Sequence, residues 1–406
     1  MRCKMVSDVM RRDRFLKIWK FFHLADNTKV DATDKYYKLR PLIEKLQSKF
    51  AQFYVPEKNL NFDESMVKYF GRHSCKQFIK GKPIRFGYKV WCLNGKSGYL
   101  INFNICQRKD PKFNENYSSV FGACAAPFIT MMDELPNDKK HLPYSLFCDN
   151  LFTSFHLLNH FKERGYDVTG TIRDNRIPKN CPIVSTAMMK RKQRAEATSI
   201  LDRTNGIILV CWVDNNVVTI VSTSSGVNPQ SMVKRYSRAS KKVIKVLQPH
   251  LITNYNNFMG GTDLMNENIN RFRIGLRSKK WNWVLYTWLL DATIQNAWIL
   301  SKKSGNNLTQ LQFRREIVKV YLTKYKTTPK QGSRSESSAS SRSFCRVSDN
   351  VRFDGQGHLL VPVAQNKKIR CAGENCSSIM RTKCVKCDVG LCKNYPSKLL
   401  MNGLSE

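Results

Sequence analysis

Two segments near the start of the chain carry apolar residues at helical spacing. The first covers residues 13–24, and the second begins at Pro41, a residue type that favours the first turn of a helix. The apolar positions are Phe15, Ile18, Trp19 and Phe22 in the first segment and Leu42, Ile43, Leu46, Phe50 and Phe53 in the second. The pattern predicts two amphipathic helices.

After Pro56 the apolar residues alternate with a period of two, which is typical of strands. The alternating runs cover residues 60–63, 88–92 and 99–105, and Asn94-Gly95 supplies a hairpin turn before the third. Further on, the pattern predicts a helix over 117–135, a strand over 144–148, a helix over 154–164 and a strand over 168–172. This βββαβαβ order is shared by RNase H-like nucleases, in which carboxylates of the first and fourth strands end side by side. The RNase H-like fold class is therefore an expectation by analogy.

The second half of the chain changes in pattern. Residues 178–248 contain a basic run at 190–194 and an alternating segment at 207–221, and together these predict a small β-rich insertion. Residues 327–348 are rich in Ser, Arg and Lys and predict a linker. Between them lies a long helical stripe, which we expect to pack on the two opening helices. Its residues are Trp281, Val284, Leu285, Trp288, Ala292 and Ile299.

The chain is strongly basic. Its 406 residues include 68 Lys and Arg against 31 Asp and Glu, a formal net charge of +37, and 42% of them are hydrophobic. That apolar share excludes a disordered polyelectrolyte, and no run reaches the roughly 18 apolar residues of a membrane span. The opening residues lack the apolar core of a secretory signal, so we expect an intracellular protein with reduced thiols. The charge favours nucleic acid as partner; a basic protein that merely resides near ribosomes or acidic lipids is the alternative.

Three carboxylates stand where predicted strands end or helices begin: Asp63, Asp149 and Asp263. Asp263 follows Gly260-Gly261, which permit a close backbone approach. Three carboxylates in one pocket would raise one another's pKa unless divalent cations balanced them. Two Mg²⁺ ions would activate a water or a 3′-hydroxyl and stabilise the leaving oxygen of a phosphodiester. The ordinary interpretation of each residue is a strand-end cap or a solvated loop carboxylate, and composition alone does not select them.

Four blocks between residues 11 and 300 resemble piggyBac transposases, in the order of that family. The first resembles the family's helical DNA-binding and dimerisation region, and the other three resemble its catalytic segments. The blocks are Arg11-Arg12-Asp13-Arg14-Phe15 with Phe22-His23-Leu24 and Asp26-Asn27; Phe62-Asp63-Glu64-Ser65-Met66 with Gly71-Arg72, Lys82-Pro83 and Gly87-Tyr88-Lys89; Asp149-Asn150-Leu151-Phe152-Thr153-Ser154 with Gly170-Thr171-Ile172-Arg173-Asp174-Asn175-Arg176; and Asn254-Tyr255-Asn256 with Gly260-Gly261-Thr262-Asp263 and Lys280-Trp281.

The resemblance implies a cut-and-paste DNA transposase or a domesticated derivative. The implied Asp triad is Asp63, Asp149 and Asp263, with Mg²⁺ or Mn²⁺ as cofactor, for hydrolysis and strand transfer at TTAA-flanked element ends. The implied partners are double-stranded DNA carrying terminal repeats and a second copy of the chain in a homodimer, located in the nucleus. A catalytically impaired, chromatin-associated DNA-binding protein is the alternative, and a different RNase H-like nuclease is a weaker one.

The expected fold class is α/β, with an RNase H-like catalytic core, a β-rich insertion and a split α-helical DNA-binding and dimerisation domain. We expect the helical region over 1–57 and 273–326, the core over 58–175 and 251–272, the insertion over 176–250, a linker over 327–368 and a cysteine-rich tail over 369–406.

Two departures from the family pattern qualify these expectations. Members usually begin with a further N-terminal region, so we expect part of the helical surface to be missing and cleavage of DNA to be poor. Many members carry a second acidic residue where this chain has Asn266, and an amide oxygen brings no charge to a metal ion. We therefore expect a lower metal affinity.

The tail carries closely spaced cysteines at Cys371, Cys376, Cys384, Cys387 and Cys392. In a reduced compartment this spacing favours structural Zn²⁺; a degenerate tail with unligated thiols is the alternative. The family's tail is a cross-brace finger with two zinc ions and further ligands, which this chain lacks. We therefore expect at most one zinc, with Cys392 competing as a ligand.

A basic cluster precedes the long helix, at Arg271, Arg273, Arg277, Lys279 and Lys280. With Trp281 and Trp283 it would suit a DNA-binding face, because the cations neutralise phosphates and the rings stack on unpaired bases. A solvated cationic entry to a helix is the alternative. The run at 190–194 has three interpretations: a nuclear localisation signal, a DNA contact or a solvated helix.

Overall fold

The computed structural model describes residues 4–107, 114–237, 240–275, 280–324, 354, 357–363, 367–372 and 376–390. The chain divides into two compact units. The larger unit comprises residues 16–325, and the smaller comprises residues 1–15 and 326–406. Of the linker predicted over 327–368, the Ser-, Arg- and Lys-rich part at 327–348 lies outside the described residues, whereas residues 360–362 form a strand, β12.

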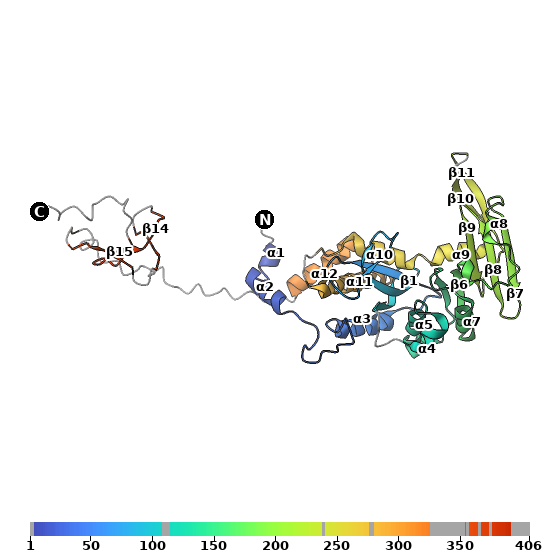
Figure 1. Ribbon diagram of the computed structural model, residues 1–406, viewed down its shortest axis with the longest axis horizontal. Helices are drawn as coiled ribbons and strands as arrows, with labels where there is room; N and C mark the ends of the chain where they lie inside the picture. Colours follow the sequence, from blue (N-terminus) through green and yellow to red (C-terminus); the bar gives the residue numbers. More distant parts are fainter. Residues whose placement is uncertain are drawn as a thin grey trace. The chain divides into compact units, whose positions relative to one another are not determined.

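The larger unit is organised around one nine-stranded sheet in its described part (Figure 1). The spatial order is β2-β3-β1-β5-β6-β9-β8-β7, and β4 pairs with β3 beside β2. The strands are β1 (Asn59–Lys68), β2 (Gln77–Phe78), β3 (Phe86–Gly95), β4 (Leu100–Ile105), β5 (Ser145–Cys148), β6 (Asp167–Thr171), β7 (Ala197–Asp202), β8 (Ile207–Val213) and β9 (Val217–Ser222). The centre of the sheet is parallel, because β5 runs parallel to both β1 and β6, and its flanks are antiparallel.

The strands expected from the period-two pattern are confirmed, with the hairpin between β3 and β4. The segment over 178–248, predicted to be β-rich, contains five strands in its described residues. Three of its strands, β7 to β9, extend the main sheet, because β9 pairs with β6. The remaining two, β10 (Ser231–Ser237) and β11 (Lys242–Gln248), form a separate antiparallel hairpin.

Helices flank the sheet. Those in the described residues are α1 (Lys4–Ser7), α2 (Arg12–Phe21), α3 (Arg40–Phe53), α4 (Glu115–Phe121), α5 (Ala126–Asp133), α6 (Asn137–Lys140), α7 (Phe155–Glu163), α8 (Thr186–Met189), α9 (His250–Phe258), α10 (Gly261–Arg271), α11 (Trp281–Lys303) and α12 (Gln310–Lys324). The prediction of a single helix over 117–135 is wrong, because two helices, α4 and α5, lie there. Gly122 ends α4 with a φ of 85°, a conformation that stops a helix, and α5 begins four residues later.

Two hydrophobic cores lie on the two faces of the sheet. One packs even-numbered β1 residues such as Phe62 against α5 and α7, and the other packs Val67 against α3, α10 and α11. Because side chains alternate along a strand, the odd-numbered residues of β1 face α10. Asn61, Asp63 and Ser65 belong to this odd-numbered set.

The long helix α11 packs on both opening helices: its stripe residues Leu285 and Trp288 share a core with Ile43 of α3, and Trp283, which lies outside the stripe, contacts α2. The Trp283 ring stacks on Trp19 of α2 with centroids 4.3 Å apart, and Phe22 lies 5.5 Å from it. On another face of α11, Asn296 binds β4: its Oδ1 accepts the Leu100 N–H at 2.9 Å and its Nδ2 donates to the Leu100 carbonyl at 2.8 Å. The amide thereby satisfies backbone groups of a short edge strand.

The described part of the smaller unit contains four short strands. β12 (Leu360–Pro362) pairs with β15 (Thr382–Cys384), and β13 (Ile369–Arg370) pairs with β14 (Ile379–Met380). Across the described ranges of both units, no helix has the length and apolar character that crossing a membrane requires.

Candidate active site

Asp63 and Asp149 lie side by side where two parallel strands part. In the β1–β5 ladder the last paired residues are Phe62 and Cys148; Asp63 is the next residue of β1, and Asp149 is the first residue after β5. Cys148 also pairs with Gly170 of β6, so Thr171 follows in the same row. The Thr171 hydroxyl donates to Asp149 Oδ1 at 3.0 Å. The sheet therefore collects two carboxylates and a hydroxyl across three neighbouring strands.

Helix α10, which carries the exposed Asp263, makes two contacts with β1. The Thr262 backbone N–H and hydroxyl both donate to Asn61 Oδ1 at 3.0 Å. One helical turn later, Ser65 Oγ donates to Asn266 Oδ1 at 2.5 Å. The two contacts lie two residues before and two residues after Asp63, so α10 is held along the strand at the height of that carboxylate.

One glycine makes this approach possible. A Cβ atom on Gly261 would lie 2.2 Å from Asn61 Nδ2 and 2.4 Å from the Gly95 carbonyl oxygen. A Cβ atom on Gly260 would meet nothing within 4 Å. The close approach expected of the Gly260-Gly261 pair therefore depends on Gly261 alone.

The acidic residues also share a lysine. Lys82 Nζ lies 3.1 Å from Glu64 Oε1, and its pKa is raised: burial opposes the rise, but the charges of Glu64, Asp63 and Asp263 outweigh it. Asp263 and Asp63 are thus both within electrostatic reach of one ammonium group.

Burial raises the pKa of Asp63 to about 7, and the Glu64 carboxylate adds to the rise. The backbone N–H of Glu64 and the charge of Lys82 act in the opposite direction. Within the described residues, Glu64 Oε2 is buried without a hydrogen-bond partner. Buried carboxylate oxygens in excess of their local donors fit a hard divalent cation such as Mg²⁺ or Mn²⁺.

Sequence reasoning gave no role to Tyr255 and Arg176, which also belong to this region. Tyr255 of α9 has a raised pKa because it is buried, with the nearby charges of Asp149 and Asp63 adding to the effect, and its hydroxyl lies 3.5 Å from Thr171 Oγ1. Asp149, Thr171 and Tyr255 line a groove of about 780 Å³. Arg176 donates to the carbonyls of Asn150, Leu151 and Thr153, and so holds the loop that follows Asp149. Both residues occur in the blocks that resemble piggyBac transposases, and that resemblance was the signal that could have identified them.

The predicted basic cluster is only partly a free surface. Arg271 is exposed and pairs with Glu267, and Lys280 is exposed. Arg273 is half-buried, donates to the Val284 carbonyl at 3.0 Å, and has a pKa that burial lowers. Arg277 and Lys279 lie outside the described residues.

The two neighbouring rings differ in their access to bases: Trp283 is buried, whereas Trp281 is only half-buried, so its role as a DNA contact stays a prediction. Trp281 lies 4.6 Å from the His73 ring, and Trp283 is 7% exposed beneath Trp19. Trp281 packs against the edge of the hydrophobic core around α11, and Trp283 stacks with Trp19 instead, so the Trp283 ring is not available to bases.

In the smaller unit, the ligand atoms of His358, Cys384 and Cys387 lie within 4.8 Å of one another. Asp354 contacts the far ring nitrogen of His358 at 3.0 Å, an arrangement common behind metal-binding histidines. Burial would raise the pKa of Cys384, but the backbone N–H of Cys387 and the His358 ring outweigh it and lower that pKa. Cys371 and Cys376 are not in this group, and Cys392 lies outside the described residues. Sequence spacing missed His358.

The chain is similar to known transposases and their derivatives. A family model described as Transposase IS4 matches residues 1–298. The human PiggyBac transposable element-derived protein 3 is 39% identical over 388 residues, which are 95% of this chain and 63% of that protein. The human PiggyBac transposable element-derived protein 2 is 34% identical over 370 residues, 91% of this chain and 60% of that protein. The chain therefore spans about three fifths of the length of these relatives.

A solved structure shares the fold. The cryo-EM structure of a piggyBac transposase synaptic complex with hairpin DNA matches 96% of this chain and 80% of the transposase chain, with a TM-score of 0.62 and 17% identity. The mixed α/β sheet flanked by helices agrees with that fold. Because the family model alone covers well over half of the residues, the chain belongs to the piggyBac group of IS4-type transposases.

Proposed function

We propose that this chain carries a metal-dependent DNA strand-transfer site of the piggyBac type, in an RNase H-like core. Asp63, Asp149 and Asp263 are the proposed metal-binding and catalytic triad. The observation that carries the proposal is the strand-end row, in which Asp63 and Asp149 follow the paired residues Phe62 and Cys148. The contacts of α10 with Asn61 and Ser65 support the inclusion of Asp263.

The chain's own residues would orient this site. Thr171 donates to Asp149 and fixes one carboxylate oxygen, while Arg176 fixes the loop behind it. Lys82 balances Glu64, so that the negative charge at Asp63 and Asp263 is offset from one side. Bound Mg²⁺ or Mn²⁺ would lower the pKa of an attacking water or 3′-hydroxyl and stabilise the leaving oxygen.

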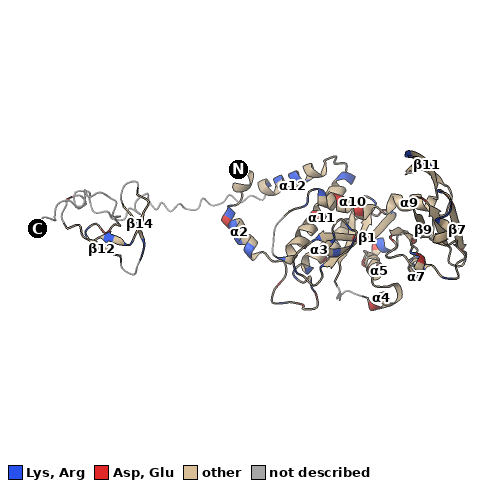
Figure 2. Ribbon diagram, turned by 45° about the horizontal axis from the view of Figure 1, so that its top comes forward, with Lys and Arg blue, Asp and Glu red and all other residues tan. Residues whose placement is uncertain are grey.

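The proposed substrate is double-stranded DNA with terminal repeats and TTAA target sites, bound by a homodimer in the nucleus. A net charge of +37 supports a polyanionic substrate, and Figure 2 shows Lys and Arg spread over the helices and strands of the larger unit. The similar solved complex contains hairpin DNA, which points to the same substrate class. Lys280 and Arg271 remain proposed phosphate contacts because they are exposed.

A second candidate function is a DNA-binding protein that retains the fold but cleaves poorly. By the family resemblance, Asn266 stands where many members carry a second acidic residue, and its side-chain oxygen already accepts the Ser65 hydroxyl, which favours this candidate. The human relatives are also named as transposable element-derived proteins.

A cleavage assay separates the two candidates. The full chain is incubated with a fluorescent duplex carrying a TTAA junction, in Mg²⁺, Mn²⁺ or EDTA. The triad proposal expects metal-dependent cleavage that Asp149→Asn abolishes and Asp167→Asn preserves, because Asp167 lies at the opposite end of β6. If the chain binds the duplex but does not cleave it in Mg²⁺ or Mn²⁺, the result supports the second candidate, a DNA-binding protein that cleaves poorly. Calorimetric Mn²⁺ binding that Asp149→Asn leaves unchanged would contradict the metal assignment.

In the smaller unit, we propose one structural Zn²⁺ held by Cys384, Cys387 and His358. The contact between Asp354 and His358, and the lowered pKa of Cys384, support a thiolate and imidazole donor set. Cys371, Cys376 and Cys392 remain candidates for the fourth ligand.

A further inference from the structure

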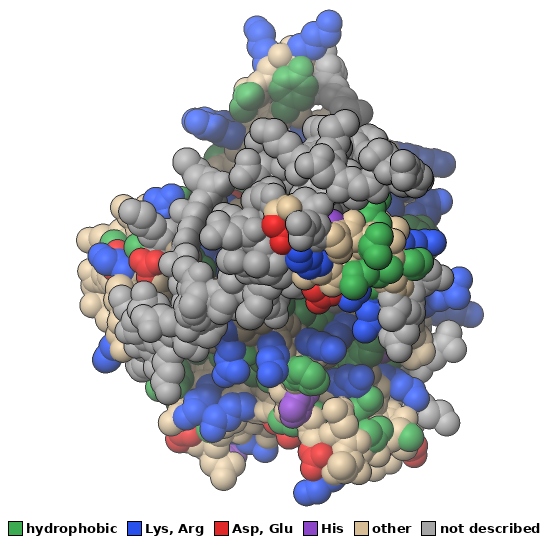
Figure 3. Space-filling model, turned by 90° about the vertical axis from the view of Figure 1, so that its left-hand side faces the viewer, with side chains coloured by type: hydrophobic (Ala, Val, Ile, Leu, Met, Phe, Trp, Pro, Cys, Tyr) green, Lys and Arg blue, Asp and Glu red, His purple; other side chains and the backbone are tan. Residues whose placement is uncertain are grey.

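The hairpin β10–β11 exposes one complete face. On that face the residues form three cross-strand pairs: Met232 with Leu247, Lys234 with Lys245, and Tyr236 with Val243. All six are exposed, Met232 and Val243 each at 64% and Tyr236 at 56%. Figure 3 shows a projection at the top of the molecule where basic side chains flank hydrophobic ones, at the height of the β10–β11 tip in Figure 1.

The charge on this face is unbalanced. Lys234 and Lys245 stand directly opposite each other, and like charges at that position destabilise a hairpin. The sequence between Asp214 and Asp263 contains six Lys and Arg and no Asp or Glu. The segment therefore supplies no carboxylate to this face. A polyanion bound across both lysines would remove the repulsion.

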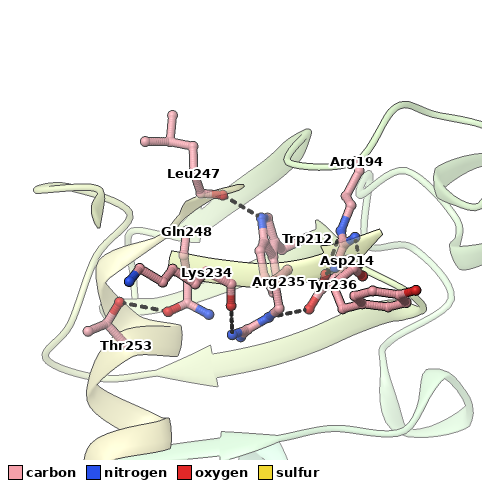
Figure 4. A network of polar contacts seen from close by, with 9 residues as sticks. All are labelled: Arg194, Trp212, Asp214, Lys234, Arg235, Tyr236, Leu247, Gln248 and Thr253. Atoms are coloured by element: carbon pink, nitrogen blue, oxygen red, sulfur yellow. Dashed lines mark hydrogen bonds and ion pairs between the residues drawn. The ribbon is translucent and has the colours of Figure 1, made fainter. Parts of the chain in front are cut away.

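The opposite face holds the hairpin on the sheet. Val246 is buried against Trp212, and the Trp212 indole donates to the Leu247 carbonyl at 3.0 Å. Asp214 accepts from Arg194 at 2.7 Å and from Arg235 at 2.9 Å, as Figure 4 shows. The arginine of the inner face is thus neutralised by an ion pair, whereas within the described residues Lys234 and Lys245 form no ion pair with a carboxylate.

We infer that the outer face of β10–β11 is a duplex-DNA contact separate from the triad. A two-stranded ribbon is narrow enough to enter the major groove, and the ion pairs beneath keep it rigid. Lys234 and Lys245 neutralise backbone phosphates, while Tyr236 and Met232 supply apolar contacts to sugars and base edges. This inference rests on the proposed function in one respect, that the substrate is DNA.

Binding measured in EDTA tests the inference without catalysis. Fluorescence anisotropy with a 30-mer duplex is followed over a salt series for the full chain and for Lys234→Gln/Lys245→Gln. Two lost phosphate contacts flatten the slope of log affinity against log salt by about 1.8, at about 0.9 per contact. The matched control, Lys58→Gln/Lys302→Gln, removes the same charge from exposed positions outside the insertion and leaves the slope within about 0.5 of the wild type. An equal slope change in both double variants would overturn the inference.

A single charge reversal adds a readout that misfolding cannot imitate. Lys245→Glu creates a cross-strand pair with Lys234, so the melting temperature holds or rises while duplex affinity falls at least tenfold. Lys234→Arg/Lys245→Arg retains wild-type affinity. If Lys245→Glu melts as expected and binds duplex as tightly as the wild type, the face is not a DNA contact.

The outcomes also separate this inference from the proposed function. If the wild-type chain binds no duplex, both the inference and the proposed function are contradicted. If the wild type binds duplex and Lys234→Gln/Lys245→Gln leaves the salt slope of the affinity unchanged, only the inferred hairpin contact is contradicted. If the hairpin variant loses affinity for a single-stranded RNA 30-mer and not for the duplex, the DNA assignment is overturned in favour of RNA.

Discussion

Ser65 donates its hydroxyl proton to the side-chain oxygen of Asn266 at 2.5 Å, across 201 positions of sequence. Asn61 and Thr262 make the matching contact, also 201 positions apart. Together these two pairs hold the first turns of α10 along β1, with Asp63 between the contacts and Asp263 on the helix. The polar face of one strand thus decides where the third aspartate lies.

The approach of α10 predicts unequal effects at two adjacent glycines. Gly261→Ala places a methyl group 2.2 Å from Asn61 Nδ2 and 2.4 Å from a carbonyl oxygen, so α10 must shift. We expect a loss of about 2–3 kcal/mol in the free energy of unfolding, by analogy with overpacked cores. Gly260→Ala is the control and changes stability by less than about 0.5 kcal/mol, because its site is open. Urea denaturation of both variants measures the difference; equal effects would contradict the close approach.

Acid sensitivity is predicted at the connection into α3. Arg40 donates to Asp34 from Nε at 2.6 Å and from a terminal nitrogen at 2.7 Å. Burial would raise the pKa of Asp34, but these bonds and the Tyr36 N–H lower it overall. A carboxylate whose pKa is lower in the folded state stabilises the protein above the unfolded pKa of about 3.9, and this contribution disappears as pH falls through the folded value.

The corresponding variant is Asp34→Asn. At pH 7 we expect it to lose about 2 kcal/mol of unfolding free energy, because the arginine loses its charged acceptor. The difference in unfolding free energy between the variant and the wild type then narrows as pH falls below about 4. Chemical denaturation at pH 7, 5 and 3 tests this, and a gap that stays constant would show that the ion pair is not the cause.

Attachment of α2 is predicted to depend on Trp283. No α2 residue is fully buried, and Trp19 stacks on Trp283. Trp283→Ala therefore releases the helix, and limited trypsin digestion cuts at Lys17 and Lys20 at least about tenfold faster, because α2 loses its ring stack on α11. Trp298→Ala on the same helix is the control, because its indole donates to Leu308 instead. Equal acceleration in both variants would indicate general destabilisation.

Metal content of the tail is predicted to be one zinc per chain. Mass spectrometry of the purified full chain measures it, and we expect Cys384→Ser and His358→Ala to lose the metal because each removes a clustered ligand. Cys124→Ser, in the larger unit, retains it. Two tightly held zinc ions in the wild type, or one retained in Cys384→Ser, would contradict the assigned ligands.

Much of the fold could be predicted from local pattern. The period of two gives β1, β3 and β4, and the helical stripe with its two tryptophans gives α11, because each pattern reflects burial of one face of a single element. The break at Gly122 was missed because a positive φ at one glycine depends on the surrounding packing. His358 was missed because it lies 26 residues from Cys384, with no repeating spacing to mark it.

By itself, the sequence determined the family, the basic character and the order of the main strands, since motif order and apolar periodicity are properties of neighbouring residues. Only the tertiary structure decided which residues meet. The β1–β5 register sets Asp63 beside Asp149, α10 is held by Asn61 and Ser65, and β10–β11 turns Lys234 and Lys245 to the same exposed face. Each of these depends on pairing between segments far apart in the chain, where strand register and packing choose among positions that look alike in sequence.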